Sequence, residues 1–139
     1  MSELKLVDIR NYPDISPKSG TNGVLSVVEQ SEFPFKRVFW ITDLYGSNHR
    51  AGHAHKRLEQ FLVCLEGYCR INVLKQNGDG ETFQLKSDNK GLWVPPLHWL
   101  DIGDFRRGTI LLVLASEPYD VNDYINNRNE FLVTNGSGI

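Results

Sequence analysis

An all-β domain is the fold class that this sequence predicts, and three observations support it. Short segments rich in β-branched and aromatic residues recur at a spacing of roughly 8–12 residues, which is typical of sandwiches and barrels. Turn signals separate these segments, the clearest being Asn77-Gly78-Asp79-Gly80. A helical pattern appears only near the C-terminus, and 139 residues suffice for one domain with a substantial core.

The predicted strands follow one another along the chain. We expect them at residues 4–9, 23–29, 37–42, 61–65, 68–74, 82–85, 91–94 and 110–115. Two of them, 61–65 and 68–74, are expected to form a hairpin around Glu66-Gly67, with Cys64 opposite Cys69. We interpret both cysteines as buried, reduced thiols, because disulfides are rare in a reducing cytosol.

The C-terminal part of the chain is predicted to hold a short helix and a tail. Asp120 is placed to cap a helix that includes Asp123 and runs on to Phe131. Residues 134–139 are polar and glycine-rich, so we expect a mobile tail. The sequence shows no internal repeat or linker, and residues 1–139 are therefore predicted to form a single domain.

The charge balance and the apolar runs exclude several classes of partner. Lysine and arginine number 15 against 17 acidic residues, whereas nucleic-acid binders and membrane-surface proteins usually carry a basic excess. The longest apolar runs are too short to cross a bilayer. A secretory signal needs a basic and then an apolar stretch, whereas acidic residues interrupt the first ten residues of this chain. We therefore expect a cytoplasmic protein without a membrane or nucleic-acid partner.

Two predicted strands are apolar at every position, whatever the direction of the side chain. Residues 61–65 and 110–115 show this pattern, which in an all-β protein indicates strands covered on both faces. One face can lie inside a barrel, and the other must meet a second sheet or a second subunit. We therefore predict a homodimer.

Three of the four histidines, His49, His53 and His55, fall within seven residues. Because His53 and His55 are two positions apart, their side chains point to the same face of a strand. Metal ligation, acid–base catalysis and a structural role are all open on this spacing alone. Imidazole suits proton transfer because its ordinary pKa of about 6.5 lies close to neutral pH.

These histidines belong to a longer pattern. His53-x-His55, followed by Gln60 and Gly67, resembles the first sequence motif of the cupins. The segments RAGHAHK at 50–56 and VLASEPYDVNDY at 113–124 resemble, more narrowly, the WxcM-like sugar 3,4-ketoisomerases that act on dTDP-4-keto-6-deoxyglucose. The likeness implies a cupin barrel (a jelly roll or double-stranded β-helix), a homodimer, a dTDP-linked keto-deoxy sugar as substrate, and neither metal nor cofactor. It also implies a place in the synthesis of amino-deoxy sugars for surface polysaccharides.

The resemblance further implies roles for individual residues. His53 matches the catalytic base, and His55 is expected to be its proton partner or to orient the substrate. Arg37, Arg50 and Lys56 match positions that face the diphosphate, for which fixed positive charge is suited. The other positions expected to bind the substrate are Gln60, Phe39, Asn22, Trp99, Leu100 and Asp101.

Three positions depart from the family's pattern. Phe39 stands where the family usually has a tyrosine, Asn22 where it has an arginine, and Leu100 where it has a histidine or an arginine. All three are expected to border the sugar, so the departures point to a different configuration at C4, a different sugar or lost activity. Tyr45 and His49 are candidates to supply the missing groups.

The predicted function is a sugar 3,4-ketoisomerase that moves a keto group from C4 to C3 through an enediol. A metal-dependent cupin dioxygenase is disfavoured, because Gln60 and Leu100 replace two ligands of a cupin metal site, although His98 is an alternative third ligand. Two further alternatives stay open. One is a non-catalytic cupin that binds nucleotide sugars, and the other is an isomerase or epimerase of a different nucleotide sugar.

Overall fold

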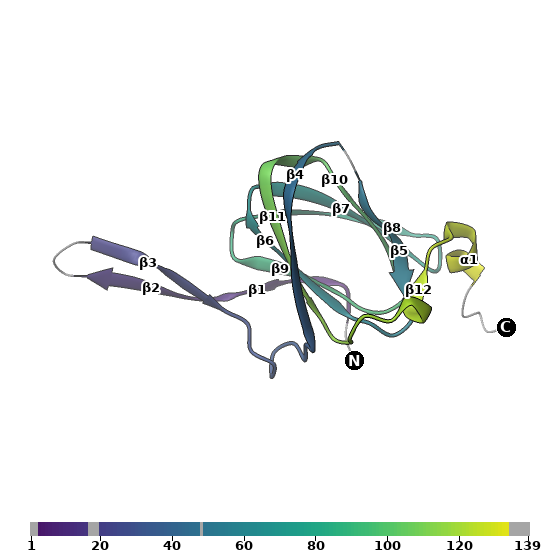
Figure 1. The fold of residues 1–139 in the computed structure, drawn as a ribbon, viewed down its shortest axis with the longest axis horizontal. Helices are drawn as coiled ribbons and strands as arrows, with labels where there is room; N and C mark the ends of the chain where they lie inside the picture. Colours follow the sequence, from purple (N-terminus) through teal and green to yellow (C-terminus); the bar gives the residue numbers. More distant parts are fainter. Residues whose placement is uncertain (1–2, 17–19, 48, 134–139) are drawn as a thin grey trace.

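The computed structural model describes residues 3–16, 20–47 and 49–133, and for 11–16 and 20–22 it describes the backbone. Two five-stranded antiparallel sheets face each other, and one short α-helix lies at the C-terminal end (Figure 1). The prediction of an all-β, cupin-like fold with a short C-terminal helix is thereby confirmed. The expected mobile tail, residues 134–139, lies outside the described residues.

The chain passes back and forth between the two sheets. The first sheet has the order β1 (Lys5–Asp8), β9 (Lys90–Val94), β6 (Gln60–Glu66), β11 (Phe105–Ala115) and β4 (Arg37–Gly46). The second sheet has the order β12 (Tyr124–Ile125), β5 (Arg50–His55), β10 (His98–Gly103), β7 (Tyr68–Lys75) and β8 (Gly80–Lys86). Within the described part of these two sheets, only β7 and β8 are both consecutive in the sequence and neighbours in a sheet. The other neighbouring strands of the two sheets come from separate parts of the sequence, so the fold brings the N-terminal half of the chain against the C-terminal half.

Strands β2 (Arg10–Ser16) and β3 (Gly20–Val27) form a separate two-stranded ribbon, which extends away from the two main sheets (Figure 1). The sequence did not predict β2, because residues 13–22 are rich in turn-forming residues. Both strands of an isolated ribbon are edge strands, however, and an edge tolerates a residue such as Pro13, which cannot donate a backbone hydrogen bond.

The predicted hairpin of 61–65 with 68–74 is wrong. Strand β6 pairs with β9 and β11, whereas β7 pairs with β8 and β10, so the two strands belong to different sheets. The chain turns between them at Gly67, whose φ of 89° favours glycine. Cys64 and Cys69 lie on either side of this turn as buried free thiols.

The main core fills the space between the sheets. Leu62 and Leu111 from the first sheet pack with Ile71, Leu100 and Val73 from the second, and all five are almost fully buried. Burial of this kind contributes about 1.5–3 kcal/mol for each large aliphatic side chain. The alternation along each strand therefore decides which side chains can reach the interior.

A second core covers the outer face of the first sheet. Phe33 packs on Phe61 and Trp93, with ring centroids 5.7 and 4.8 Å away. Val63 and Leu114 join the same cluster. The outward apolar positions of β6 and part of β11 are thus covered by an upstream segment of the same chain, where the sequence predicted a second sheet or subunit.

The C-terminal helix is shorter than predicted. The Asp120 side chain accepts a hydrogen bond from the Asn122 amide, but it caps only the 3₁₀ turn η1 (Val121–Asp123). Strand β12 follows, and α1 (Arg128–Val133) begins after it, with Asn127 accepting a hydrogen bond from the Glu130 amide at 2.9 Å. Among the described residues, no helix has the length and apolar character that a membrane span requires.

Candidate active site

A cavity of about 170 Å³ lies between the two sheets. Apolar side chains, Phe39 among them, form much of its wall. Its polar lining consists of Arg37, Arg50, His53, His55, Gln60 and Tyr124. All of these except Tyr124 were predicted site residues, so the fold gathers most of the predicted site in one place.

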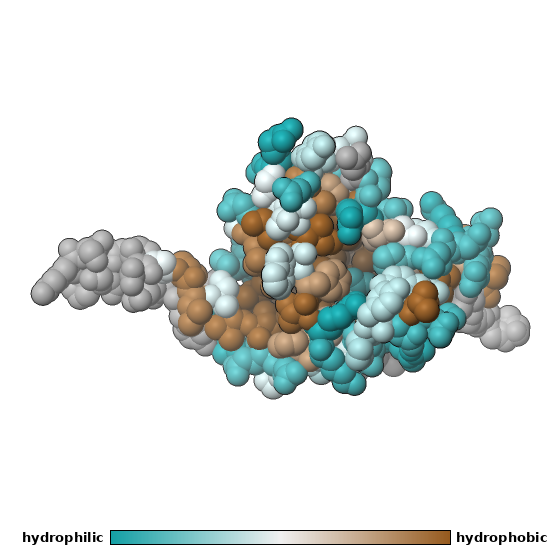
Figure 2. Space-filling view, viewed as in Figure 1, coloured by the Kyte–Doolittle hydropathy of each residue, from teal (hydrophilic) through white to brown (hydrophobic). Residues whose placement is uncertain are grey.

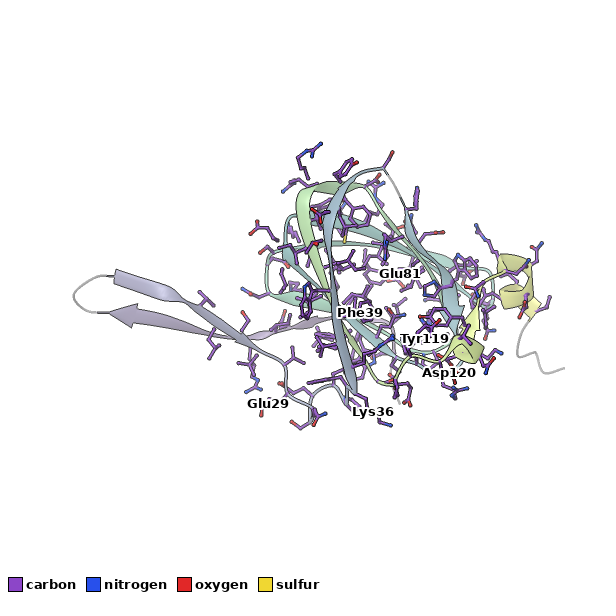
Figure 3. The ribbon with its side chains drawn as sticks, viewed as in Figure 1. Glu29, Lys36, Phe39, Glu81, Tyr119 and Asp120 are labelled. Atoms are coloured by element: carbon purple, nitrogen blue, oxygen red, sulfur yellow. The ribbon has the colours of Figure 1, made fainter. Side chains whose placement is uncertain are left out.

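Strand periodicity explains why these side chains meet. On β4, Arg37, Phe39 and Ile41 line the cavity, whereas Val38 and Trp40 between them are exposed on the outer face. On β5, His53 and His55 point inward in the same way. Figure 3 shows Phe39 on β4 and Tyr119 next to β12. Since β4 belongs to the first sheet and β5 to the second, the cavity is built from facing strands of both sheets.

The two inward histidines stand almost at right angles to each other. Their ring centroids are 4.9 Å apart, and the ring planes make an angle of 89°. The Tyr124 ring contacts both, with centroid distances of 4.8 Å to His53 and 4.4 Å to His55. Three aromatic rings, all of which carry a group able to exchange a proton, thus share one wall of the cavity.

A buried carboxylate orients His55. The His55 Nδ1 lies 3.0 Å from Asp123 Oδ2, and both side chains are about 5% exposed or less. Asp123 also accepts hydrogen bonds from the backbone amides of Arg57, at 2.7 Å, and Leu58, at 3.3 Å. Since a carboxylate only accepts hydrogen bonds, the neutral imidazole carries its proton on Nδ1 and leaves the Nε2 lone pair free.

Asp123 was missed as a site residue. The sequence placed it in a predicted helix, and its side chain instead joins β5 to η1 across 68 residues. Its position in the DVNDY segment was the available signal. Nothing in that local pattern shows which distant histidine the carboxylate faces.

The surroundings keep both histidines neutral near pH 7. Burial lowers the pKa of His55 to about 4, and repulsion from a protonated His53 adds to this effect. The hydrogen bond that His55 donates to Asp123 only partly offsets the shift. Burial also lowers the pKa of His53, against a backbone contact with Ala51 that acts in the opposite direction. Neutral imidazoles can accept a proton, so either ring is able to act as a base.

Arg37 supplies fixed positive charge to the same cavity. Its guanidinium lies 5.0 Å from the Phe39 ring centroid and 5.8 Å from that of Tyr119. Its Nε is buried and has no hydrogen-bond partner in the described part of the chain. A buried donor without a hydrogen-bond partner costs about 1–3 kcal/mol. An anionic ligand that accepts a hydrogen bond from this Nε would remove that cost.

Four predicted residues lie away from this cavity. Lys56 is exposed just beyond the end of β5 and does not line the cavity. Leu100 is only 1% exposed and belongs to the main core. Trp99 and Asp101 point to the outer face of the second sheet, where they line a separate groove with Arg128. The side chain of Asn22 lies outside the described residues.

The candidates for the missing groups are also elsewhere. Tyr45 is exposed, and Arg107 stacks on its ring at 4.9 Å in a different hollow. His49 is exposed and does not line the cavity. His98, the alternative metal ligand, lies 3.0 Å from the Pro96 carbonyl oxygen through its Nδ1. Within the described ranges, no three histidine, cysteine or acidic side chains are grouped to hold a metal ion.

Solved structures share this fold along nearly the whole chain. A sugar 3,4-ketoisomerase, QdtA from Thermoanaerobacterium thermosaccharolyticum in complex with TDP, is 34% identical, with 93% of this chain and 91% of that chain covered and a TM-score of 0.80. The WlaRB TDP-quinovose 3,4-ketoisomerase from Campylobacter jejuni is 35% identical, with 95% and 98% covered and a TM-score of 0.82. A histidine-to-asparagine variant of QdtA, solved with TDP-4-keto-6-deoxyglucose, is 32% identical, with 95% and 93% covered and a TM-score of 0.81.

The fold and the site define a cupin-like protein whose cavity is equipped for acid–base chemistry on an anionic ligand. A curated relative, the TDP-4-oxo-6-deoxy-alpha-D-glucose-3,4-oxoisomerase of Aneurinibacillus thermoaerophilus, is 38% identical over 123 residues, which are 87% of this chain and 86% of that protein. The chain belongs to the FdtA family, described as WxcM-like, C-terminal, whose model matches residues 2–136. The resemblance seen in the sequence is thereby confirmed.

Proposed function

We propose that this protein is a sugar 3,4-ketoisomerase, which moves the keto group of a TDP-4-keto-6-deoxyhexose from C4 to C3. The observation that carries the proposal is the pair of neutral, perpendicular imidazoles, His53 and His55, with Asp123 behind the second. Relatives with this activity in the same family support the choice of reaction and of substrate class.

The reaction needs a base beside a sugar carbon. A ketone at C4 makes the hydrogen on C3 acidic, and His53 removes it to give an enediol. The protonated His53 then returns a proton to C4, which leaves the ketone at C3. His55, held by Asp123, orients the sugar and stabilises the protonated neighbour. A positioned acid–base group of this kind contributes typically about 10²–10⁴-fold in rate.

In the proposed complex, two arginines hold the diphosphate. Arg37 and Arg50 both line the cavity that contains the histidines. A guanidinium forms paired hydrogen bonds with phosphate oxygens, and the buried Nε of Arg37 lacks an internal partner. Gln60 lines the same cavity and is proposed to bind the sugar. Trp99, Leu100 and Asp101 do not face it, so the proposed complex does not use them.

The function is tested by incubating the protein with TDP-4-keto-6-deoxyglucose in D₂O and following the sugar protons by NMR. Deuterium at C3 or C4 together with a 3-keto product is the expected result. Tight TDP binding without exchange would overturn the isomerase and support a nucleotide-sugar-binding module. His53→Asn is expected to abolish the exchange, and unchanged exchange would remove His53 from the role of base.

We also propose that two copies associate through the free edge of the first sheet. Strand β4 is the last strand of that sheet, and Trp40 on its outer face is 65% exposed. Val38 is exposed beside it, and Figure 2 shows apolar side chains gathered along this part of the surface. An exposed edge with large apolar side chains is typical of an association surface. The cytoplasm remains the proposed location, in keeping with the unbridged thiols of Cys64 and Cys69.

A further inference from the structure

The proposed reaction includes a proton transfer between the C3 and C4 oxygens of the sugar, and the roles given to the two histidines do not account for it. Moving a keto group from C4 to C3 needs one hydrogen carried between carbons and a second carried between the two sugar oxygens. His53 serves the carbons. The Nδ1–H of His55 is donated to Asp123, so this imidazole offers only its free Nε2 lone pair, which can accept a proton but has none to give to the C4 oxygen at the start. A group that first donates a proton and then takes one back is therefore suited to the two oxygens.

Tyr124 carries the only hydroxyl among the described residues that line the cavity. The lining also lacks carboxyl and thiol groups in the part of the chain that the structure describes, and an arginine does not release its proton at ordinary pH. No hydrogen bond to another described residue engages the Tyr124 hydroxyl. The phenol is thus the remaining protein group in the cavity that is able to give up and take back a proton.

The fold fixes the Tyr124 ring at the histidines. Strand β12 pairs with β5 so that Tyr124 lies opposite His55 and Ile125 opposite Ala54. Ile125 is 0% exposed and packs in a small core with Ala54 and Phe131. Because side chains alternate along a strand, anchoring Ile125 in that core turns Tyr124 toward the cavity, where its ring centroid lies 4.4 and 4.8 Å from the two imidazoles.

We propose that Tyr124 is a catalytic residue that carries the proton between the C3 and C4 oxygens, and this inference rests on the proposed function. As His53 takes the C3 hydrogen as a proton, the electrons of that C–H bond form the C3=C4 double bond. The carbonyl oxygen at C4 accepts the proton of the Tyr124 hydroxyl, which gives the enediol and a phenolate.

The second half of the reaction restores every group. The Tyr124 phenolate takes the proton of the C3 hydroxyl, and the carbonyl forms at C3. The electrons of the C3=C4 bond take the proton from His53 at C4. Tyrosine and histidine end in their starting states, no electron leaves the sugar, and the product differs from the substrate only in the position of the keto group.

The test compares Tyr124→Phe with the wild-type protein and with Tyr45→Phe. Tyr45→Phe is the matched control, because it removes an equivalent hydroxyl from a different hollow. We expect Tyr124→Phe to lower kcat by about 100-fold or more, with the Kd for TDP within about threefold of wild type. Tyr45→Phe is expected to leave both unchanged. A kcat for Tyr124→Phe within about threefold of wild type would overturn the proposal.

A second pair of measurements separates the hydroxyl from the packing of the ring. Tyr124→Leu removes the ring as well, and we expect its kcat to match that of Tyr124→Phe. A loss seen only in Tyr124→Leu would show that packing matters instead and would overturn the proposal. In addition, 3,5-difluorotyrosine at position 124, which has a more acidic phenol, is expected to move the alkaline limb of kcat to lower pH. An unmoved limb would likewise count against the role.

The wild-type assay distinguishes this inference from the function on which it rests. If wild type does not convert TDP-4-keto-6-deoxyglucose, the proposed function fails and the role of Tyr124 fails with it. If wild type converts the sugar and Tyr124→Phe does so equally well, only the role of Tyr124 is lost.

Discussion

The imidazole of His55 and the carboxylate of Asp123 lie 3.0 Å apart in the interior, although 68 residues separate them in the sequence. Two backbone amides, those of Arg57 and Leu58, hold the same carboxylate. The contact therefore does two things at once, since it closes η1 onto the end of β5 and fixes the imidazole in the cavity. The orientation of His55 and local stability are coupled here through one side chain.

Asp123→Asn tests this coupling. The amide keeps the size of the side chain but has no charge, so it no longer holds His55 in a single tautomer. We expect kcat to fall by about 10- to 100-fold, with TDP affinity little changed, when the ketoisomerase reaction is followed by NMR. Asp8→Asn, which alters an exposed carboxylate paired with Lys90, is the control and is expected to keep full activity. An Asp123→Asn protein as active as wild type would show that the carboxylate has no orienting role.

The lowered pKa of His55 predicts how stability depends on pH. Its pKa is about 4 in the folded protein against an ordinary value of 6.5, so protons bind the unfolded chain more tightly. The unfolding free energy should therefore be unaffected by this group above pH 6.5. It should decrease between pH 6.5 and pH 4, by up to about 3 kcal/mol.

Urea unfolding at pH 7.5, 6 and 5 measures the effect. His55→Asn, which cannot be protonated in this range, is expected to show a smaller loss of stability over the same interval. Equal slopes for wild type and His55→Asn would mean that other groups account for the acid sensitivity. A wild-type stability that increases toward pH 5 would contradict the sign of the shift.

The sequence predicts eight of the twelve strands that the structure describes, and the shared face of the two β5 histidines, because these rest on local periodicity. It does not predict β2, β5, β10 or β12 as strands. Strand alternation places His53 and His55 on one face whatever the remaining fold, and the same holds for Arg37 and Phe39 on β4. These residues reach the cavity as expected. Local pattern does not specify which sheet a strand joins, and for this reason 61–65 and 68–74 were expected to pair and do not.

The errors at the site have a related cause. On β10, Leu100 faces the core while Trp99 and Asp101 face outward, so three consecutive residues cannot share one cavity. Asp123 and Tyr124 reach the site because β12 pairs with β5, which is a contact between distant segments. Their segment carries a helical capping signal, and that signal gives no indication of a two-residue strand.

Arg37→Lys tests the anion subsite. Lysine keeps the positive charge but loses the planar guanidinium and the buried Nε–H, so one or more hydrogen bonds to phosphate are lost. A hydrogen bond to a charged group contributes about 1.5–3 kcal/mol, which predicts an increase of roughly 10- to 100-fold in the Kd for TDP by calorimetry. Arg70→Lys, at an exposed arginine paired with Asp104, is the control and should bind as wild type. Unchanged affinity in Arg37→Lys would remove this residue from the phosphate site.

Trp40→Glu tests the proposed homodimer. A carboxylate at the centre of the exposed face of β4 would have to be desolvated in a symmetric contact, where it would also meet its own copy. We expect light scattering to give a dimeric mass for wild type and a monomeric mass for Trp40→Glu. Leu132→Glu places the same charge at an exposed apolar position on α1 and should stay dimeric. A monomeric wild type, or a dimeric Trp40→Glu, would assign the β4 face another role.

Gly91 allows the closest approach between β9 and the second core. A Cβ at this position would overlap the Phe61 ring, which is itself packed against Phe33 and Trp93. Gly91→Ala is therefore expected to lower the unfolding free energy by roughly 1–3 kcal/mol, as overpacking does in other cores. Gly80→Ala is the matched control, because a Cβ there would lie at an ordinary 3.7 Å from the Val73 carbonyl oxygen. If thermal unfolding of the two variants is the same, Phe61 moves more freely than its neighbours suggest. If only Gly91→Ala is destabilised, the neighbours of Phe61 in the second core hold its ring in place.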